Sequence, residues 1–340
     1  MQVTLKDIAE ASGYSITTVS RALAGYDDVN EQTRAHIRVI AKRMGYHPNV
    51  VARQLQSQRT QTIGMIIPAT LTGYEDDFFS LLLKGVTHAA TRRHYDVLVS
   101  AQLHETDAMD AYRRIAGGRR VDGLILARTH RHDPRIQYLQ EINHPFVVSG
   151  RASPGQLSDF PYIDADSQYG IRLLVDHFVS YGHRHIGLIL PPEDIAYTPY
   201  RLNGYKHGLD EAGIAFDPNA VIHGDLTRKG GCKAMLELLH RTPHLTAVIA
   251  CNDLMALGAI TAISQSGLTV GDDVAVGGFD DLPLAEHAQP SLTTVRQPIY
   301  EIGEQLTDLL IRIIDGKTVN EPGKLLNPTL IIRESSGKPR

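Results

Sequence analysis

Residues 15–21 place hydrogen-bonding side chains along one face of a short predicted helix. The segment reads Ser-Ile-Thr-Thr-Val-Ser-Arg, and helical spacing turns Val19 inward while Thr17 and Arg21 face outward. An arginine can donate two hydrogen bonds to a guanine edge, a threonine hydroxyl can bond either base type, and an isoleucine can contact a thymine methyl. Ile16, Thr17 and Arg21 are therefore candidate side chains for reading base edges in the major groove of DNA.

The elements around this segment predict a helix, a tight turn and a second helix over residues 4–23. Thr4 can cap the first helix and Ser15 can cap the second. Gly13 supplies the backbone freedom that a sharp turn needs. The pattern by itself fits either a DNA-reading module or a small amphipathic helical hairpin.

A third helix is predicted to follow the pair. Asn30 is its expected cap, and Gly45 and Pro48 end it. Its predicted buried stripe consists of Ile37, Ile40, Ala41 and Met44. Residues 50–55 then form a helix-competent run that has nothing of its own to pack on.

Charge is unevenly divided along the 340 residues, whose net charge is −4. Residues 1–60 carry eight Lys/Arg against five Asp/Glu, and the remainder carries 26 against 33. A basic N-terminal part on an acidic body favours a polyanionic partner at one end of the chain. With 42% hydrophobic residues the chain can bury several cores, so two or three domains are expected.

From residue 61 onward, short β-rich runs alternate with amphipathic helical segments, and this series occurs twice. Two parallel-sheet lobes with helices on both faces are therefore predicted. Ligands of such sheets bind beyond the carboxyl ends of the strands, so two facing lobes create one cleft. The predicted strands lie near 62–67, 95–99, 121–126, 145–148, 186–190, 221–222, 247–250 and 274–278.

This order of elements resembles the LacI/GalR family of bacterial transcription regulators over essentially the whole chain. One departure is Tyr14, where the family usually has valine. The resemblance implies a helix-turn-helix head joined to two lobes like those of a periplasmic sugar-binding protein. The residues that carry it are Thr18 to Arg21, Val29-Asn30, Thr33-Arg34, Tyr46 to Asn49, Ala52 and Leu55.

The resemblance also implies how DNA is bound. Residues 49–57 would form a hinge helix only on operator DNA, where it pairs in the minor groove with the hinge of a second copy. Asn49, Ala52 and Leu55 are the expected hinge contacts, with Leu55 as the apolar wedge. A homodimer is expected because a two-fold protein matches a palindromic operator. The candidate phosphate contacts are Ser15, Thr18, Ser20, Asn30, Thr33, Arg34 and Tyr46.

The expected fold is an all-α helix-turn-helix DNA-binding domain followed by an α/β periplasmic-binding-protein-like core of two parallel-sheet lobes. The domains are residues 1–46, the hinge helix and linker 47–60, and the effector-binding domain 61–340. By the resemblance, the chain crosses between the lobes near residues 163, 291 and 321. Lobe one then spans 61–163 and 292–320, and lobe two spans 164–291 and 321–335.

Polar residues after two strands of the second series are candidate effector ligands. Asp280 follows a predicted strand, where a carboxylate can accept hydrogen bonds from sugar hydroxyls, although a helix cap or surface turn is the alternative. Asn252 follows another strand, and Asp253 is the expected cap of the next helix. Arg201 begins a helix and matches the family's ligand-contacting arginine; a solvated arginine is the alternative.

Lobe one contributes further candidates at the position of a family signature, Asn/Asp-Pro-Phe-Phe. Asp76 could bind a hydroxyl, and Phe78 and Phe79 could pack on the C–H surface of a sugar or anchor the following helix. Asp77 stands where the family has proline. The resemblance also assigns Arg151 and Asp166 to the cleft.

Several other functions lack support in the sequence. There is no Gly-x-Ser-x-Gly elbow and no Walker loop, so an enzyme is not expected. The histidines of His130-x-His132 and His183-Arg184-His185 lack carboxylate or thiolate partners and are expected to be solvated or capping, with no metal and no cofactor. Cys232 and Cys251 have no paired spacing, which favours a reducing cytoplasm. No signal peptide or run of about 18 apolar residues is present, so no membrane association is expected.

The sequence thus predicts a cytoplasmic, sequence-specific DNA-binding regulator. We expect a repressor that a small effector, a mono- or disaccharide, releases from its operator. The alternatives are a purine- or nucleoside-responsive regulator of the corepressor type, and a sugar-binding protein whose N-terminal helices have no DNA function.

Overall fold

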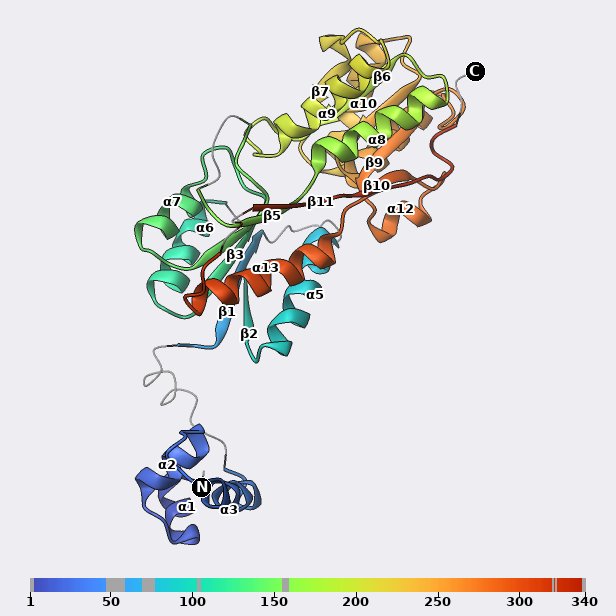
Figure 1. Cartoon of the computed structure of the whole chain (residues 1–340). Coiled ribbons are helices and arrows are strands. Elements are labelled where there is room, and N and C mark those ends of the chain that lie inside the picture. Colours follow the sequence, from blue (N-terminus) through green and yellow to red (C-terminus); the bar gives the residue numbers. More distant parts are fainter. Residues whose placement is uncertain are drawn as a thin grey trace. The chain divides into compact units, whose positions relative to one another are not determined.

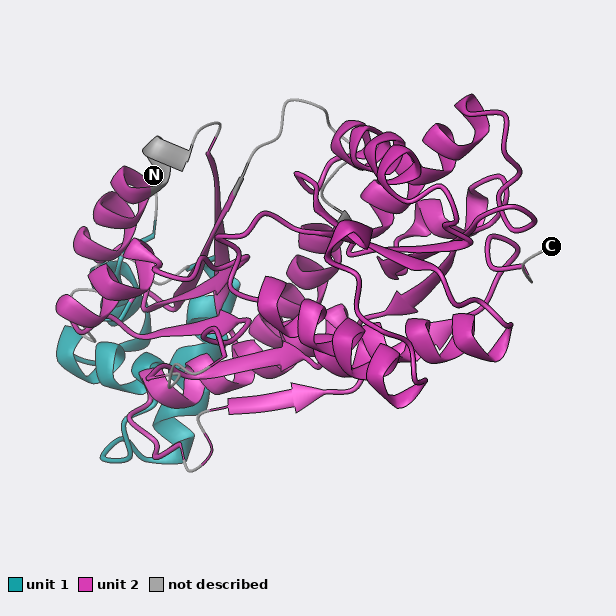
Figure 2. Ribbon diagram, turned by 90° about the horizontal axis from the view of Figure 1, so that it is seen from above, with its two compact units in different colours: residues 1–59 teal, residues 60–340 magenta. Residues whose placement is uncertain are grey.

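The computed structural model describes residues 3–46, 59–68, 77–102, 105–154, 159–319, 321 and 323–337. The chain divides into a unit of residues 1–59 and a unit of residues 60–340, coloured separately in Figure 2. The predicted hinge residues Asn49, Ala52 and Leu55, and also Asp76, lie outside the described residues. No helix within the described ranges is long and apolar enough to cross a bilayer.

The first unit contains the three predicted helices, α1 (Leu5–Ser12), α2 (Ile16–Ala24) and α3 (Glu31–Arg43). Their predicted caps are confirmed, because the side chains of Thr4, Ser15 and Asn30 each accept a hydrogen bond from a first-turn backbone N–H. Gly13 ends α1 in the left-handed region, at φ 74°. The helices enclose a core of Ile8, Ala9, Val19, Ala22, Val29, Ile37 and Ala41.

The second unit is built on two six-stranded sheets, which define lobe one and lobe two. The sheet of lobe one is entirely parallel, in the order β11-β5-β4-β3-β1-β2, and the sheet of lobe two has the order β12-β10-β9-β8-β6-β7 with only β12 antiparallel. Lobe one contains β1 (Thr62–Pro68), β2 (Asp96–Gln102), β3 (Gly123–Ala127), β4 (Phe146–Ser149), β5 (Tyr162–Ala165) and β11 (Gly323–Leu326). Lobe two contains β6 (Ile186–Leu190), β7 (Val221–His223), β8 (Ala247–Ala250), β9 (Ala275–Asp280), β10 (Thr293–Arg296) and β12 (Thr329–Ile331).

Helices cover both faces of each sheet. In lobe one, α5 (Asp77–Arg92) and α13 (Ile299–Ile314) lie side by side on one face, and α6 (Glu105–Tyr112), a π-helical turn (Arg113–Gly117) and α7 (Pro134–Glu141) cover the other (Figure 1). Lobe two has α8 (Ser167–Ser180), α9 (Thr198–Glu211), the 3-10 turn Pro218–Ala220, α10 (Arg228–Arg241), α11 (Asp253–Gln265) and α12 (Pro283–His287). Strands such as β3, β6 and β8 are buried along their whole length, as expected for a sheet covered on both faces.

The chain crosses between the lobes three times, as expected, but at later positions. β10 pairs with β9, so lobe two extends to Arg296 rather than ending near 291. β11 pairs with β5, so residues 323–326 belong to lobe one rather than lobe two. The expected boundaries came from the resemblance, and they misplace β10 and β11, two short strands with polar residues that the hydrophobic pattern had not predicted.

Two glycines allow α5 and α13 to pack closely on lobe one. A Cβ atom at Gly85 would overlap the backbone carbonyl of Tyr300, and a Cβ atom at Gly303 would overlap the carbonyl of Leu82. The two helix backbones therefore touch at these positions.

We expect Gly85→Ala to lower the free energy of unfolding by about 1–3 kcal/mol, because the added methyl forces the two helix backbones apart. Urea denaturation of the full chain measures this change. Lys84→Ala is the matched control, since Lys84 is exposed on the same helix turn. An equal stability for the two variants would show that the helix pair accommodates the methyl without strain.

Candidate nucleic-acid interface and interlobe cavity

The outer face of α2 carries the predicted base-reading residues. Ile16 is 49% exposed, and Thr17 and Arg21 are also exposed. Val19 and Ala22 on the opposite face are buried in the core of the first unit. The helix therefore presents an exposed apolar residue, a hydroxyl and a guanidinium on one face, which is the set expected to read base edges.

Arg21 is held in place by neighbours that follow α2. Its guanidinium forms an ion pair with Asp28, in which Nε lies 3.2 Å from the carboxylate, and it lies 5.2 Å from the centre of the Tyr26 ring. Both members of the ion pair are about half exposed. An exposed pair of this kind contributes little to stability, so a guanine edge can replace Asp28 as the partner of Arg21 at small cost.

The predicted phosphate contacts differ in how freely they can donate. The hydroxyl of Ser15 lies 2.8 Å from that of Thr18, and Asn30 accepts a bond from the backbone N–H of Thr33 at 2.8 Å. Arg34 donates to the carbonyls of Tyr26 and Val29 and pairs with Glu31 at 2.9 Å.

Arg34 is therefore engaged inside the first unit, and the structure disfavours it as a phosphate contact. Tyr46 is half-buried against the same core, where loss of hydration raises the pKa of its hydroxyl. Ser20 is also partly buried. The role of Arg34 was not visible in the sequence because it depends on how the loop after α2, with the carbonyls of Tyr26 and Val29, folds.

The second unit has a cavity of about 250 Å³ between its lobes. Lobe one contributes Phe78, Arg128 and His130, and lobe two contributes the remaining residues, most of which follow the carboxyl ends of β6, β7, β8 and β9. This is the location that the parallel-sheet rule predicts for a ligand. The residues from lobe two are Pro192, Asp194, Ile195, Asp225, Leu226, Thr227, Asn252, Leu254, Asp280 and Leu282.

Asp280 lies in the cavity wall, as predicted. It is the last residue of β9 and has a φ of 124°, a region that non-glycine residues rarely adopt. The amide of Gln297 donates to its carboxylate at 2.5 Å. Loss of hydration raises the pKa of Asp280 to about 6, although Arg201, Gln297 and Arg128 act in the opposite direction.

Arg201 is buried and is not among the residues that line the cavity. Only 3% of the residue is exposed, and its guanidinium donates to the carbonyl of Cys251. It lies 4.0 Å from the centre of the Phe279 ring and 4.4 Å from that of Tyr197. The guanidinium thus connects the ends of β8 and β9, and its Nε has no hydrogen-bond partner among the described residues, so the ligand contact of Arg201 stays a prediction.

Asn252 lines the cavity, but it also performs the capping role that the sequence assigned to Asp253. Its side-chain oxygen accepts from the N–H of Met255 at 2.8 Å, and its amide donates to the carbonyl of Leu226 at 2.9 Å. Asp253 is fully buried, where it accepts from the N–H of Leu282 at 2.7 Å and from the hydroxyl of Thr294. The assignment of Asp253 as the helix cap was wrong.

The adjacent residues Phe78 and Phe79 of lobe one have different roles. Phe78 lines the cavity, whereas Phe79 is buried in the core with residues of β1 and α13, which matches the alternative that one of the pair anchors the helix. The guanidinium of Arg128 lies 5.0 Å from the centre of the Phe79 ring. Phe79 therefore supports a cavity residue instead of forming the wall.

Arg151 and Asp166 are not among the described residues that line the cavity. Asp166 caps α8 by accepting from the N–H of Tyr169 at 3.1 Å. Arg151 lies 3.7 Å from the centre of the Tyr200 ring and within 3.8 Å of the carboxylates of Asp164 and Asp166. Because Tyr200 belongs to lobe two, Arg151 connects the lobes through an aromatic contact.

Two residues of the cavity wall, Arg128 and His130, were not predicted as part of the site. Arg128 directly follows the carboxyl end of β3, so the rule that identified Asp280 would also have found it. His130 is partly exposed, but its Nδ1 also lies 2.9 Å from the carboxylate of Asp194 on lobe two, a partner that was not expected. That partner is 64 residues away, so the sequence carried no local sign of the contact.

The lobes are in direct contact beside the cavity. The N–H of Arg131 donates to the carbonyl of Asp194 at 2.8 Å, and the N–H of Ala196 donates to the carbonyl of Thr129 at 2.9 Å. The hydroxyl of Tyr200 donates to the carbonyl of Ala152 at 2.6 Å. These bonds hold residues 129–131 against 194–196 and close one side of the cavity.

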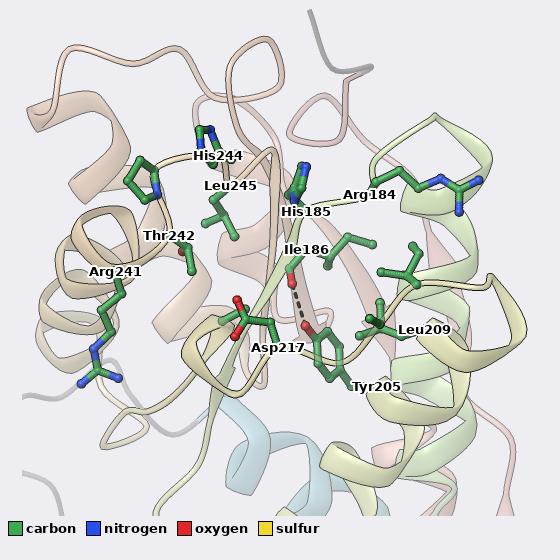
Figure 3. Close-up of a pocket in the computed structure, with 14 residues that line it drawn as sticks. Arg184, His185, Ile186, Tyr205, Leu209, Asp217, Arg241, Thr242, His244 and Leu245 are labelled. Atoms are coloured by element: carbon green, nitrogen blue, oxygen red, sulfur yellow. Dashed lines mark hydrogen bonds between the residues drawn. The ribbon is translucent and has the colours of Figure 1, made fainter.

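Figure 3 shows another pocket, of about 220 Å³, in lobe two. It lies at the amino-terminal ends of β6 and β8, where ligands of parallel sheets do not usually bind. Arg184 and Arg241 point outward, and the Tyr205 hydroxyl donates to the carbonyl of Ile186 at 2.6 Å. The cavity between the lobes is therefore the better effector site.

Neither pocket is arranged as a metal site. Across the described ranges, no three His, Cys, Asp or Glu side chains converge to hold an ion. His183 bonds to Thr246 and to the carbonyl of Gly337 instead, and both cysteines are unpaired.

Burial raises the pKa of Asp253 to about 7. The folded state then binds a proton that the unfolded state has lost, so this carboxyl stabilises the fold most at low pH and its contribution disappears as pH rises toward and beyond 7. We therefore expect Asp253→Asn to gain stability relative to the natural protein between pH 5 and 8. Urea denaturation across this range measures the difference. The exposed Asp210→Asn variant should run parallel to the natural protein, and a parallel result for Asp253→Asn would contradict protonation of the buried carboxyl.

Comparison with known proteins agrees with this architecture. A family model described as "Bacterial regulatory proteins, lacI family" matches residues 4–49, and one described as "Periplasmic binding protein-like domain" matches residues 175–336. The HTH-type transcriptional regulator CelR of Thermobifida fusca is 35% identical, over 98% of each chain. The HTH-type transcriptional repressor CytR of Escherichia coli strain K12 is 32% identical, over 98% of this chain and 96% of the relative.

Solved structures match over nearly the whole chain as well. A CelR–cellobiose complex is 34% identical, with a TM-score of 0.77, and the match covers 98% of this chain and all of the other. The lac repressor dimer bound to operator and the anti-inducer ONPF is 29% identical, with a TM-score of 0.83 and coverage of 99% and 100%. The chain therefore belongs to the lacI family of bacterial regulatory proteins and is a DNA-binding transcriptional regulator rather than an enzyme.

Proposed function

We propose that this regulator is a repressor that a mono- or disaccharide releases from a palindromic operator. The observation that carries the effector assignment is the interlobe cavity, in which residues from both lobes surround one space at the carboxyl ends of the strands. A ligand there contacts both lobes at once. The structurally similar CelR–cellobiose complex supports a saccharide as the ligand class.

The chemistry of the cavity wall also favours a polyol. Asp194, Asp225 and Asp280 provide carboxylates that accept hydrogen bonds from hydroxyls, and Thr227 offers a hydroxyl that can donate and accept. Phe78 provides an aromatic face for the C–H surface of a sugar ring. These three carboxylates outnumber the two basic side chains of the wall, Arg128 and His130. Their negative charge would repel the phosphate of a phosphorylated sugar, so such a ligand is disfavoured.

Effector binding can change the balance between lobe arrangements. A ligand shifts such an equilibrium only by its difference in affinity for the two arrangements. Arg128 and His130 on lobe one and Asp280 on lobe two contact the same space, so a ligand that bonds to both lobes favours their closure. A coupling free energy of about 1 to 3 kcal/mol would change operator affinity roughly 5- to 150-fold.

The DNA-bound form is proposed to be a homodimer acting in the cytoplasm. The similarity to the lac repressor dimer on its operator supports the dimer, and two unpaired cysteines fit a reducing compartment. Ile16, Thr17 and Arg21 are assigned to base reading, and Asn49, Ala52 and Leu55 to the minor groove. Ser15, Thr18, Ser20, Asn30, Thr33 and Tyr46 are assigned to phosphate positioning.

A thermal-shift screen of the full chain against saccharides, sugar phosphates, nucleosides and purines tests the effector class. We expect Asp280→Asn to weaken binding of the hit about 10- to 150-fold, since a hydrogen bond to a charged group contributes about 1.5–3 kcal/mol. His185→Ala, in the pocket of Figure 3, is the control and should bind normally. A hit among nucleosides or purines alone, or a hit unaffected by Asp280→Asn, would contradict the proposed saccharide site.

Base reading by α2 is tested with an operator selected from a random duplex pool. We expect Arg21→Ala to weaken operator binding by about 1–3 kcal/mol and to relax the preference at one base pair in each half-site. Arg38→Ala, at an exposed position on α3, should keep the base preference of the natural protein. An unchanged preference in Arg21→Ala would assign base reading to other side chains.

Measuring operator affinity with and without the effector then decides whether the ligand releases the protein or promotes its binding.

A further inference from the structure

At the edge of lobe one where β1 begins, Asp122 is hydrogen-bonded to the first residues of the second unit. The carboxylate of Asp122 accepts from the N–H of Thr60 at 2.6 Å and from the N–H of Gln61 at 2.9 Å, and its own N–H donates to the carbonyl of Thr62 at 2.7 Å. Asp122 precedes β3, which pairs with β1. The turn before β3 is therefore fixed beside the point where the chain arrives from the DNA-reading unit.

This turn carries an arginine cluster, which we define as Arg113, Arg114, Arg119 and Arg120. Residues 113–120 contain these four arginines and no acidic residue. All four are exposed. Arg113 pairs with Asp110 at 3.0 Å, whereas Arg114, Arg119 and Arg120 have no side-chain partner among the described residues.

The backbone holds the cluster in a compact turn. The N–H of Arg119 donates to the carbonyl of Ala116 at 3.0 Å, and the N–H of Arg120 donates to the carbonyl of Ile115 at 2.9 Å. Ile115 and Ala116 are buried in the core of lobe one. The guanidinium groups thus extend from a fixed base, which lowers the entropy lost when they bind a partner.

The positive charge of the arginine cluster contrasts with the net negative charge of the second unit. Residues 61–340 hold 26 Lys/Arg against 33 Asp/Glu, so a run of four arginines is a local exception. Nearby Arg92 and Arg93 are already paired with Glu304 and Asp308, and an exposed Asp96 lies at the same edge of the sheet. The arginine cluster is therefore the part of this edge that retains unpaired positive charge in the described structure.

We propose that the arginine cluster of lobe one is a second, sequence-independent contact for the phosphate backbone of DNA. The planar guanidinium of arginine matches phosphate geometry, and contacts to phosphate add affinity without reading sequence. The inference rests on the proposed function insofar as the first unit delivers the DNA. The proposed contact comes from the effector-binding unit and is additional to the contacts of the helix-turn-helix and the hinge.

The test compares the full-length natural protein with Arg119→Gln/Arg120→Gln. Affinity for the operator and for a scrambled duplex of equal length is measured over a series of salt concentrations. Each phosphate contact contributes about 0.9 to the slope of log affinity against log salt, so we expect the slope to fall by about 0.9 to 1.8 on both duplexes. The affinity ratio between operator and scrambled duplex should stay unchanged.

Arg184→Gln/Lys206→Gln is the matched control, because it removes the same charge from exposed positions on lobe two. It should keep the natural slope. An unchanged slope in Arg119→Gln/Arg120→Gln would overturn the proposal, as would an equal fall in the control or a loss confined to the operator. If the natural protein shows no preference for any selected operator, the proposed function fails, while the scrambled duplex still reports on the arginine cluster.

Discussion

The carboxyl ends of β8 and β9 depend on a buried cation, Arg201. Arg201 lies between the rings of Tyr197 and Phe279 and donates to the carbonyl at the end of β8. A buried guanidinium requires compensating negative groups, and Asp280 and the Cys251 carbonyl provide them. The positive charge of Arg201 in turn lowers the pKa of Asp280 and so helps keep that carboxylate ionised at the cavity wall.

The interlobe contacts explain how one ligand can influence both lobes. Residues 129–131 of lobe one and 194–196 of lobe two share backbone hydrogen bonds and the contact between His130 and Asp194. These segments extend from the carboxyl ends of strands whose neighbours line the cavity. Recognition of the ligand and closure of the lobes therefore use the same short stretches of chain.

Sequence patterns predicted the elements better than the site. Helix caps and apolar strands are local features, so Thr4, Ser15, Asn30 and the buried strands β3, β6 and β8 were all predicted correctly. The cavity wall combines residues separated by up to about two hundred positions, and no local pattern distinguishes Phe78 from Phe79 or Asn252 from Asp253. The lobe boundaries implied by the resemblance also misplaced two short polar strands, β10 and β11.

The strand β3 has a mechanical consequence. Asp122, at one end, is bonded to the residues that follow the linker, and Arg128, at the other end, lines the cavity. The five residues between them are buried and close-packed, and span roughly 16 Å at about 3.3 Å each. A packed strand of this length resists compression and bending, so a displacement of Arg128 along the strand axis reaches the linker attachment as a displacement of similar size. A single buried strand thus connects the cavity wall rigidly to the linker attachment.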